Sequence, residues 1–183
     1  MAEKSRLKYV LELSNGRANS RPRHKKGALV RGDISFNLET MANLMISAYE
    51  GTVDYDDESL QDALAEVQSY LEVGEVQPLL ACSWLFFLSG TLASACLVSQ
   101  RAGGQNPLIA NIMTGGVWKN QGLAKIVLAA SLDSLGNAGF SQVVAFIAEG
   151  NGHSERLFRG FGFKAENAPQ FEIVEPIQQA GHI

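Results

Sequence analysis

Residues 76–100 contain no charged side chain, and most of this stretch is apolar. A membrane-spanning helix needs about 20 predominantly apolar residues. Here serine, threonine and glycine interrupt the run, Ser89-Gly90 in its middle is typical of a turn, and no Lys or Arg flanks its start. We therefore predict two buried strands, residues 83–88 and 92–99, joined by a tight turn and not placed in a membrane.

Hydrophobic periodicity predicts further elements around this pair. Helical spacing appears at residues 37–49, 59–71, 122–137 and 153–160. Strand patterns appear at residues 7–13, 28–34, 107–114 and 143–148, with closing strands near Phe163 and at residues 171–174. Strands connected through helices predict a layered α/β domain with parallel pairing at its centre. A chain of 183 residues without repeats or a long linker is expected to form one such domain.

The charges are unevenly distributed along the chain. Residues 1–31 carry a net charge of +7, residues 32–100 have eleven acids and no Lys or Arg, and the whole chain is at −4. The basic run at residues 21–26 could bind a polyanion, but a solvated loop or an arm against the acidic middle is the simpler interpretation. A cleft walled by carboxylates would favour cationic amines, although acids at residues 56–58 also suit a helix N-terminus.

The cysteine content limits the chemistry further. Cys82 and Cys96 are too few for a four-ligand zinc site or a disulfide scaffold, and they fit a reducing compartment. The first residues show no secretory signal pattern, so we expect a cytoplasmic protein. We predict no bound metal, no membrane association and no nucleic-acid partner.

Residues 107–124 hold the first segment that suggests chemistry. An apolar strand ends in Gly115-Gly116, a loop follows, and a helix begins near Gly122. Main-chain N–H groups at a helix start lack intrahelical partners and, with the helix dipole, suit a phosphate group. The pattern is neither a Walker loop nor a dinucleotide fingerprint, and a tight turn that binds nothing is the alternative.

A second segment, residues 143–163, follows the next strand. Asn151 stands where it would cap a short helix, and Phe158, Phe161 and Phe163 form an aromatic group. Capping and core packing are the ordinary roles of these residue types.

Together the two segments resemble the Gcn5-related N-acetyltransferase (GNAT) superfamily. Its pyrophosphate loop, Gln/Arg-x-x-Gly-x-Gly/Ala, is similar to residues 119–124, with Lys119 in the first position. Its later pattern matches Asn151, Ser154, Leu157-Phe158 and Phe161-Gly162-Phe163 in order and spacing. The resemblance covers residues 84–165 closely and the helices at 37–72 more loosely.

The resemblance implies a mixed central sheet of about six to seven strands with helices on both faces. Strands 107–114 and 143–148 would splay apart into a wedge for acetyl-CoA, the cosubstrate. The implied cofactor-binding residues are Ile112, Met113, Thr114, Lys119, Asn120, Gln121, Gly122, Leu123, Ala124, Asn151, Ser154 and Phe158.

The resemblance also implies direct attack of an amine on the thioester, for which a base must remove the amine's proton. The strand carboxylate that often serves in the family is missing from residues 107–114, so Glu149 is the first substitute, and a solvated loop carboxylate is the alternative interpretation of Glu149. Phe158 stands where the family often has a proton-donating Tyr, so either Tyr49, Tyr55 or water serves as the acid or the thiolate leaves unassisted. The loop after the first helix would bind the acceptor through Glu50, Asp54 and Tyr55.

We therefore predict an acetyl-CoA-dependent N-acyltransferase acting on a small-molecule or peptide amine. The domain would span residues 28–183, after a basic extension at residues 1–27 that could add a strand, and a homodimer is compatible with this prediction. One alternative is a catalytically idle acyl-CoA-binding or sensor protein on the same fold. Another is a polyanion-binding module that uses the basic arm.

Overall fold

The computed structural model describes residues 5–13, 27–35, 37–53, 55, 57–72, 74–103 and 106–166. The strands are β1 (Arg6–Glu12), β2 (Gly27–Arg31), β3 (Val76–Pro78), β4 (Trp84–Leu88), β5 (Thr91–Arg101), β6 (Leu108–Thr114), β7 (Gln142–Ala148) and β8 (Lys164–Ala165). The helices are α1 (Leu38–Tyr49), α2 (Leu60–Leu71), α3 (Leu123–Asn137) and α4 (Gly152–Gly160), with short 3₁₀ turns at Leu80–Cys82 and Gly116–Trp118.

All described strands join one sheet in the order β2-β4-β5-β6-β7-β1-β8, with β3 paired to the end of β5. Among the described strands, β6 and β7 form the one parallel pair. The mixed sheet with helices on both faces is confirmed, and its eight strands exceed the six to seven expected. The closing strand predicted near Phe163 is β8, whereas β3 was not predicted because its three residues are too few to show a periodic pattern.

The main part of the uncharged run folds as predicted into two strands, β4 and β5, and a tight turn, while the start of the run forms β3 and the 3₁₀ turn at Leu80–Cys82. Leu88 pairs with Thr91 across Ser89-Gly90, whose φ angles are 51° and 82°. Two positive φ angles in a two-residue loop match the right-handed twist of the strands, and glycine adopts that conformation at little cost. In the described part of the chain, no helix is long and apolar enough to span a membrane.

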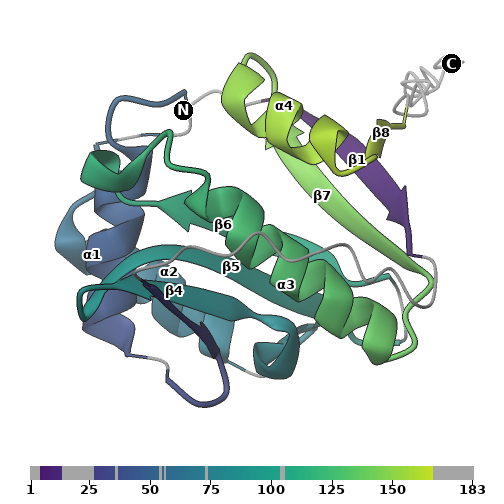
Figure 1. The fold of residues 1–183 in the computed structure, drawn as a ribbon, viewed down its shortest axis with the longest axis horizontal. Helices are drawn as coiled ribbons and strands as arrows, with labels where there is room; N and C mark the ends of the chain where they lie inside the picture. The colour runs from purple at the N-terminus through teal and green to yellow at the C-terminus, as the bar shows by residue number, and fades with distance from the viewer. Residues whose placement is uncertain are drawn as a thin grey trace, which may run out of the picture.

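Helices cover both faces of the sheet (Figure 1), and an apolar core lies on each face. Helices α1 and α2 pack on one face, where Met41, Met45 and Val67 meet Leu97 and Met113. Helix α3 crosses the other face, and α4 lies over the β7 side of the same face. The sheet therefore separates two layers of helices.

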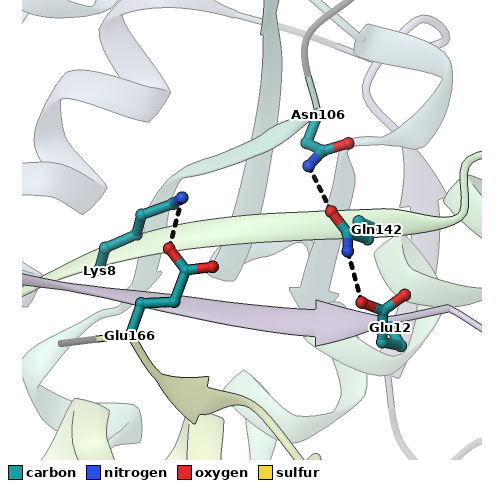
Figure 2. Close-up of polar contacts among 5 residues, drawn as sticks. All are labelled: Lys8, Glu12, Asn106, Gln142 and Glu166. Carbon is teal, nitrogen blue, oxygen red and sulfur yellow. Dashed lines mark hydrogen bonds and ion pairs between the residues drawn. The ribbon is translucent and has the colours of Figure 1, made fainter. Parts of the chain in front are cut away.

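The N-terminal strand β1 lies between β7 and β8, antiparallel to both. Figure 2 shows the polar contacts along it: Lys8 Nζ lies 2.6 Å from a carboxylate oxygen of Glu166. At its far end Gln142 Nε2 donates to Glu12, and Asn106 Nδ2 donates to Gln142 Oε1 at 2.6 Å. These contacts connect β1, β7 and the residues just before β6. The closing strand predicted at residues 171–174 lies outside the described residues.

Candidate functional site: a cleft between two diverging strands

Strands β6 and β7 begin as a pair and then separate. They pair at Leu108 with Val144 and at Ile109 with Ala145, and the Val144 N–H donates to Pro107 at 2.9 Å. Beyond this point no further β6–β7 pair is formed among the described residues, and Figure 1 shows the two strands diverging. The wedge has a closed end at Ile109 and opens toward the C-terminal ends of both strands.

A β-bulge lies where the two strands separate. On the other side of β6, Val98 pairs with Ile109 and Leu97 pairs with Asn111, so Ala110 is an extra residue in the ladder. A bulge bends its strand and increases the local twist. The bulge at Ala110 therefore gives a local reason why β6 turns away from β7 at this residue.

A cleft of about 410 Å³ occupies the wedge. Its lining comes from both strands, from both helical layers and from β1. The lining residues are Arg6, Tyr49, Glu58, Glu66, Ile109, Ala110, Asn111, Ile112, Ala145, Phe146, Ile147, Ala148, Asn151, Ser154 and Phe158. Because α4 lies on one face of the sheet and α1 and α2 on the other, the cleft passes through the sheet.

The loop between β6 and α3 adjoins the open end of the wedge. Gly122 is the N-cap of α3 with φ +78°, and the first intrahelical bonds run from Lys125 and Ile126 to the Gly122 carbonyl at 3.1 and 3.3 Å. The N–H groups of Leu123 and Ala124 therefore have no acceptor within the helix. A Cβ built on Gly122 would meet nothing within 4 Å, so there is space in front of this helix start. Backbone donors with open space before them fit a pyrophosphate.

Helix α4 supplies the lining on one face of the sheet. Asn151 is its N-cap, and its side-chain oxygen accepts the Ser154 N–H at 3.0 Å. Phe158, 3% exposed, packs edge-on against Phe163 with ring centroids 4.9 Å apart. The capping and packing roles are thus present, and the same three residues Asn151, Ser154 and Phe158 also line the cleft.

The opposite face of the sheet supplies a polar group. Asn111 follows the bulge on β6, and its Nδ2 donates to Tyr49 Oη at 3.1 Å and lies 3.5 Å from Glu66 Oε1. Tyr49 is the last residue of α1, and Glu66 lies in the second turn of α2. Three elements therefore place a phenol, an amide and a carboxylate together where the wedge begins to open.

The start of α2 is held by its own side chains. The Ser59 hydroxyl accepts the Asp62 N–H at 3.2 Å, and the Ser59 N–H donates to Asp62 Oδ2 at 2.9 Å, which completes a capping box. Hydrogen bonds from the Ser59 hydroxyl and N–H lower the pKa of Asp62 below its ordinary value. This anchors the helix that carries Glu66 and follows Glu58.

The predicted cofactor residues differ in whether they line the cleft. Ile112, Asn151, Ser154 and Phe158 line the cleft. The Met113 side chain is 1% exposed and packs in the core beside α1, so only the Met113 backbone could contact a cofactor. The Met113 carbonyl accepts a hydrogen bond from the Ser94 hydroxyl. Thr114 is half-buried and exchanges a hydrogen bond with Ser94.

The loop residues lie at the start of α3. The Lys119 N–H donates to Gly116, Asn120 has φ +63°, and the Gln121 side chain donates to the Val117 carbonyl. Leu123 is buried and Ala124 is half-buried.

The residues predicted for catalysis and acceptor binding are not gathered in one place. Tyr49 lines the cleft, whereas Glu149 is exposed in the turn after β7, with its N–H donating to Ser5. Glu50 caps the end of α1 and is exposed, and Tyr55 is half-buried; neither lines the cleft. Asp54 lies outside the described residues.

Sequence reasoning missed the lining residues Arg6, Glu58, Glu66 and Asn111. Glu66 lies on the polar face of an amphipathic helix, and nothing in the sequence distinguishes it from an ordinary solvent-exposed side chain. Asn111 gave the one usable signal, since it is a polar residue within the apolar strand 107–114. In the described part of the chain, no three His, Cys, Asp or Glu side chains are grouped to hold a metal ion.

Comparison with solved structures gives the same architecture. A GCN5-related N-acetyltransferase from Sphaerobacter thermophilus superposes with a TM-score of 0.64 at 17% identity, over 90% of this chain and 50% of that chain. A tandem GNAT protein from the clavulanic acid biosynthesis pathway gives 0.68 at 17% identity, over 88% and 50%. The chain thus spans about half the length of these two proteins.

A third structure, the aminoglycoside N-acetyltransferase AAC(6')-Iy in complex with CoA, gives a TM-score of 0.56 at 17% identity, over 81% of this chain and 95% of that chain. No protein-family model matches the chain, and no curated protein matches its sequence. At these identities the similarity establishes the architecture and not the activity. The diverging parallel strands, the helix start beside them and these superpositions agree that the chain has the fold of the GNAT superfamily.

Proposed function

We propose that this protein transfers an acetyl group from acetyl-CoA to a primary amine. The observation that carries the proposal is the cleft that passes through the sheet between β6 and β7. A long thiol ester can lie along such a wedge while a second substrate approaches from the opposite face. The CoA complex of the aminoglycoside N-acetyltransferase with this fold supports the choice of cosubstrate.

The residues suit the two ends of acetyl-CoA. The pyrophosphate would bind the N–H groups at the start of α3, with Lys119 adding a positive charge. The pantetheine arm would follow the backbone of Ile112–Thr114 and contact Asn151 and Ser154 from α4. The thioester would then lie toward the closed end of the wedge, near Asn111 and Phe158. An amine arriving from the α2 face meets the thioester there.

The proposal is tested with the unmodified protein, acetyl-CoA and a panel of primary amines. We expect acetyl-CoA to raise the melting temperature, since it binds the folded state, and we expect amine-dependent release of CoA thiol. Stabilisation without thiol release for any amine would contradict acyl transfer. That result would favour an idle acyl-CoA-binding protein, in which the phenyl ring of Phe158 has no proton to donate. Absence of stabilisation would contradict both.

A further inference from the structure

The group formed by Glu66, Asn111 and Tyr49 has a position that acyl transfer would use. It lies at the level of the bulge on β6, at the closed end of the wedge, and on the face of the sheet opposite α4. A ligand whose phosphates lie at the start of α3 points its other end toward this place. The carboxylate of Glu66 therefore faces the region where an acceptor amine must meet the thioester.

We propose that Glu66 binds the acceptor's ammonium group and removes its proton, and that Asn111 is a positioning residue for the Glu66 carboxylate. This inference rests on the proposed function. It assigns the base to helix α2, whereas the sequence pattern pointed to Glu149 after β7. Both carboxylates are exposed, but the Glu66 side chain lines the cleft and contacts Asn111, whereas Glu149 does not line it.

One ammonium proton moves to a Glu66 carboxylate oxygen, and the nitrogen lone pair forms a bond to the acetyl carbonyl carbon. The carbon–sulfur bond breaks, and a second proton passes from nitrogen to the departing sulfur. The third proton stays on the amide nitrogen, and Glu66 returns its proton to water.

Other charged or titratable groups line the cleft and bear on any pH dependence. Arg6 from β1, Tyr49 from α1 and Glu58 from the segment before α2 also line it. Asp62, one turn before Glu66, is engaged in the capping box with Ser59. Against this background, the test needs a readout that follows the proton on the acceptor and not only the overall rate.

The experiment compares two probe amines, n-butylamine and the less basic glycinamide, with acetyl-CoA saturating. For Glu66→Gln we expect kcat/KM to fall about 100-fold with n-butylamine, the scale of general base catalysis. With glycinamide the loss should be about tenfold or less, because more of this amine is neutral before it binds. The remaining activity should rise with pH in parallel with the titration of each free amine.

The matched control is Glu72→Gln, which makes the same change at the exposed C-cap of α2, away from the cleft. It should leave both amines and the acetyl-CoA-induced stabilisation unchanged. A second variant, Asn111→Asp, places another carboxylate beside Glu66. Two adjacent carboxylates hold a proton more tightly, so the acid limb of the pH profile should move to higher pH.

Several outcomes would overturn the assignment. Equal losses for the two amines in Glu66→Gln would show a structural effect only. If Glu149→Gln shows the dependence on amine basicity and Glu66→Gln does not, the base is Glu149. If the unmodified protein binds acetyl-CoA but acetylates no amine, acyl transfer fails together with this role. If amines are acetylated and Glu66→Gln behaves as the unmodified protein, the function stands and only the role of Glu66 is wrong.

Discussion

The two ends of the cleft are assembled in different ways. The proposed cofactor end comes from segments close together in the chain, β6, the start of α3 and, after β7, α4. The proposed acceptor end gathers Tyr49, Glu66 and Asn111 from three separate elements. A change at the cofactor end should therefore act locally, whereas the acceptor end depends on how a strand and two helices pack.

The strongest test uses β1, the strand that pairs with β7, which forms one side of the cleft. Tyr9 is fully buried in β1, and Tyr9→Ala should lower the free energy of unfolding by about 3–5 kcal/mol because it leaves a large cavity. Since β1 supports β7, both acetyl-CoA affinity and amine turnover should decline together. The measurements are denaturant unfolding, ligand-induced stabilisation and thiol release.

The control for this variant is Tyr9→Phe, which keeps the ring near Arg159 and removes the hydroxyl that accepts from Arg159 Nη2 at 3.2 Å. It should cost about 1 kcal/mol or less, since Arg159 is largely exposed. A loss of amine turnover alone in Tyr9→Ala would show that acetyl-CoA binding does not depend on the packing of β1 against β7.

The second test is confined to the cofactor end. Gly122→Asp and Gly122→Asn have nearly the same shape, and both residue types tolerate the positive φ of +78° better than others. The aspartate should weaken acetyl-CoA binding about 100-fold relative to the asparagine, because its charge faces the pyrophosphate at short range. Calorimetric Kd values and melting temperatures of both variants measure this. Equal affinities would remove the pyrophosphate from the start of α3.

A third, smaller effect separates two roles of one residue. Asn151→Ala removes the N-cap of α4 and should lower stability by about 1 kcal/mol. Asn151→Asp retains an oxygen that can accept the Ser154 N–H but loses the amide donor. We expect the aspartate to restore stability and not acetyl-CoA affinity. Recovery of both would mean that Asn151 acts on the cofactor only through the helix cap.

The smallest effect concerns pH and the acceptor end. The pKa of Asp62 is lower in the folded chain because Ser59 donates hydrogen bonds to its carboxylate. The charged form therefore stabilises the fold above the ordinary titration range of Asp, and this contribution disappears as the pH falls through the folded-state pKa. Asp62→Asn should lower the melting temperature at pH 7, and the difference should vanish on acidification. Glu72→Gln, at the other end of α2, should not lower it.

The contrast between the two ends also explains what the sequence could predict. The loop at residues 119–124 and the pattern from Asn151 to Phe163 are short continuous motifs, so their place beside the wedge could be inferred without coordinates. The turn at Ser89-Gly90 could be predicted from the sequence for the same reason. Each of these features is determined by residues close together in the chain.

The acceptor end could not be inferred in this way. Glu66 lies on a solvated helix face and becomes a lining residue only because α2 packs beside the bulge on β6. The bulge itself is visible only in the pairing of β6 with β5. Likewise, the pattern of residues 7–13 predicts a strand, but nothing in it indicates that its partners are β7 and β8.

The position of β1 has a consequence for how the molecule folds. Arg6 pairs with Ala148 and Glu12 with Gln142, so β1 pairs with a strand that is far from it in the sequence. Closing so long a loop costs more entropy than forming the β4–β5 hairpin, and contacts distant in sequence slow folding. We expect the hairpin to form early and the β1–β7 ribbon to form late. The cleft would then be completed late in folding, because its β7 wall is stabilised only once β1 has paired with β7.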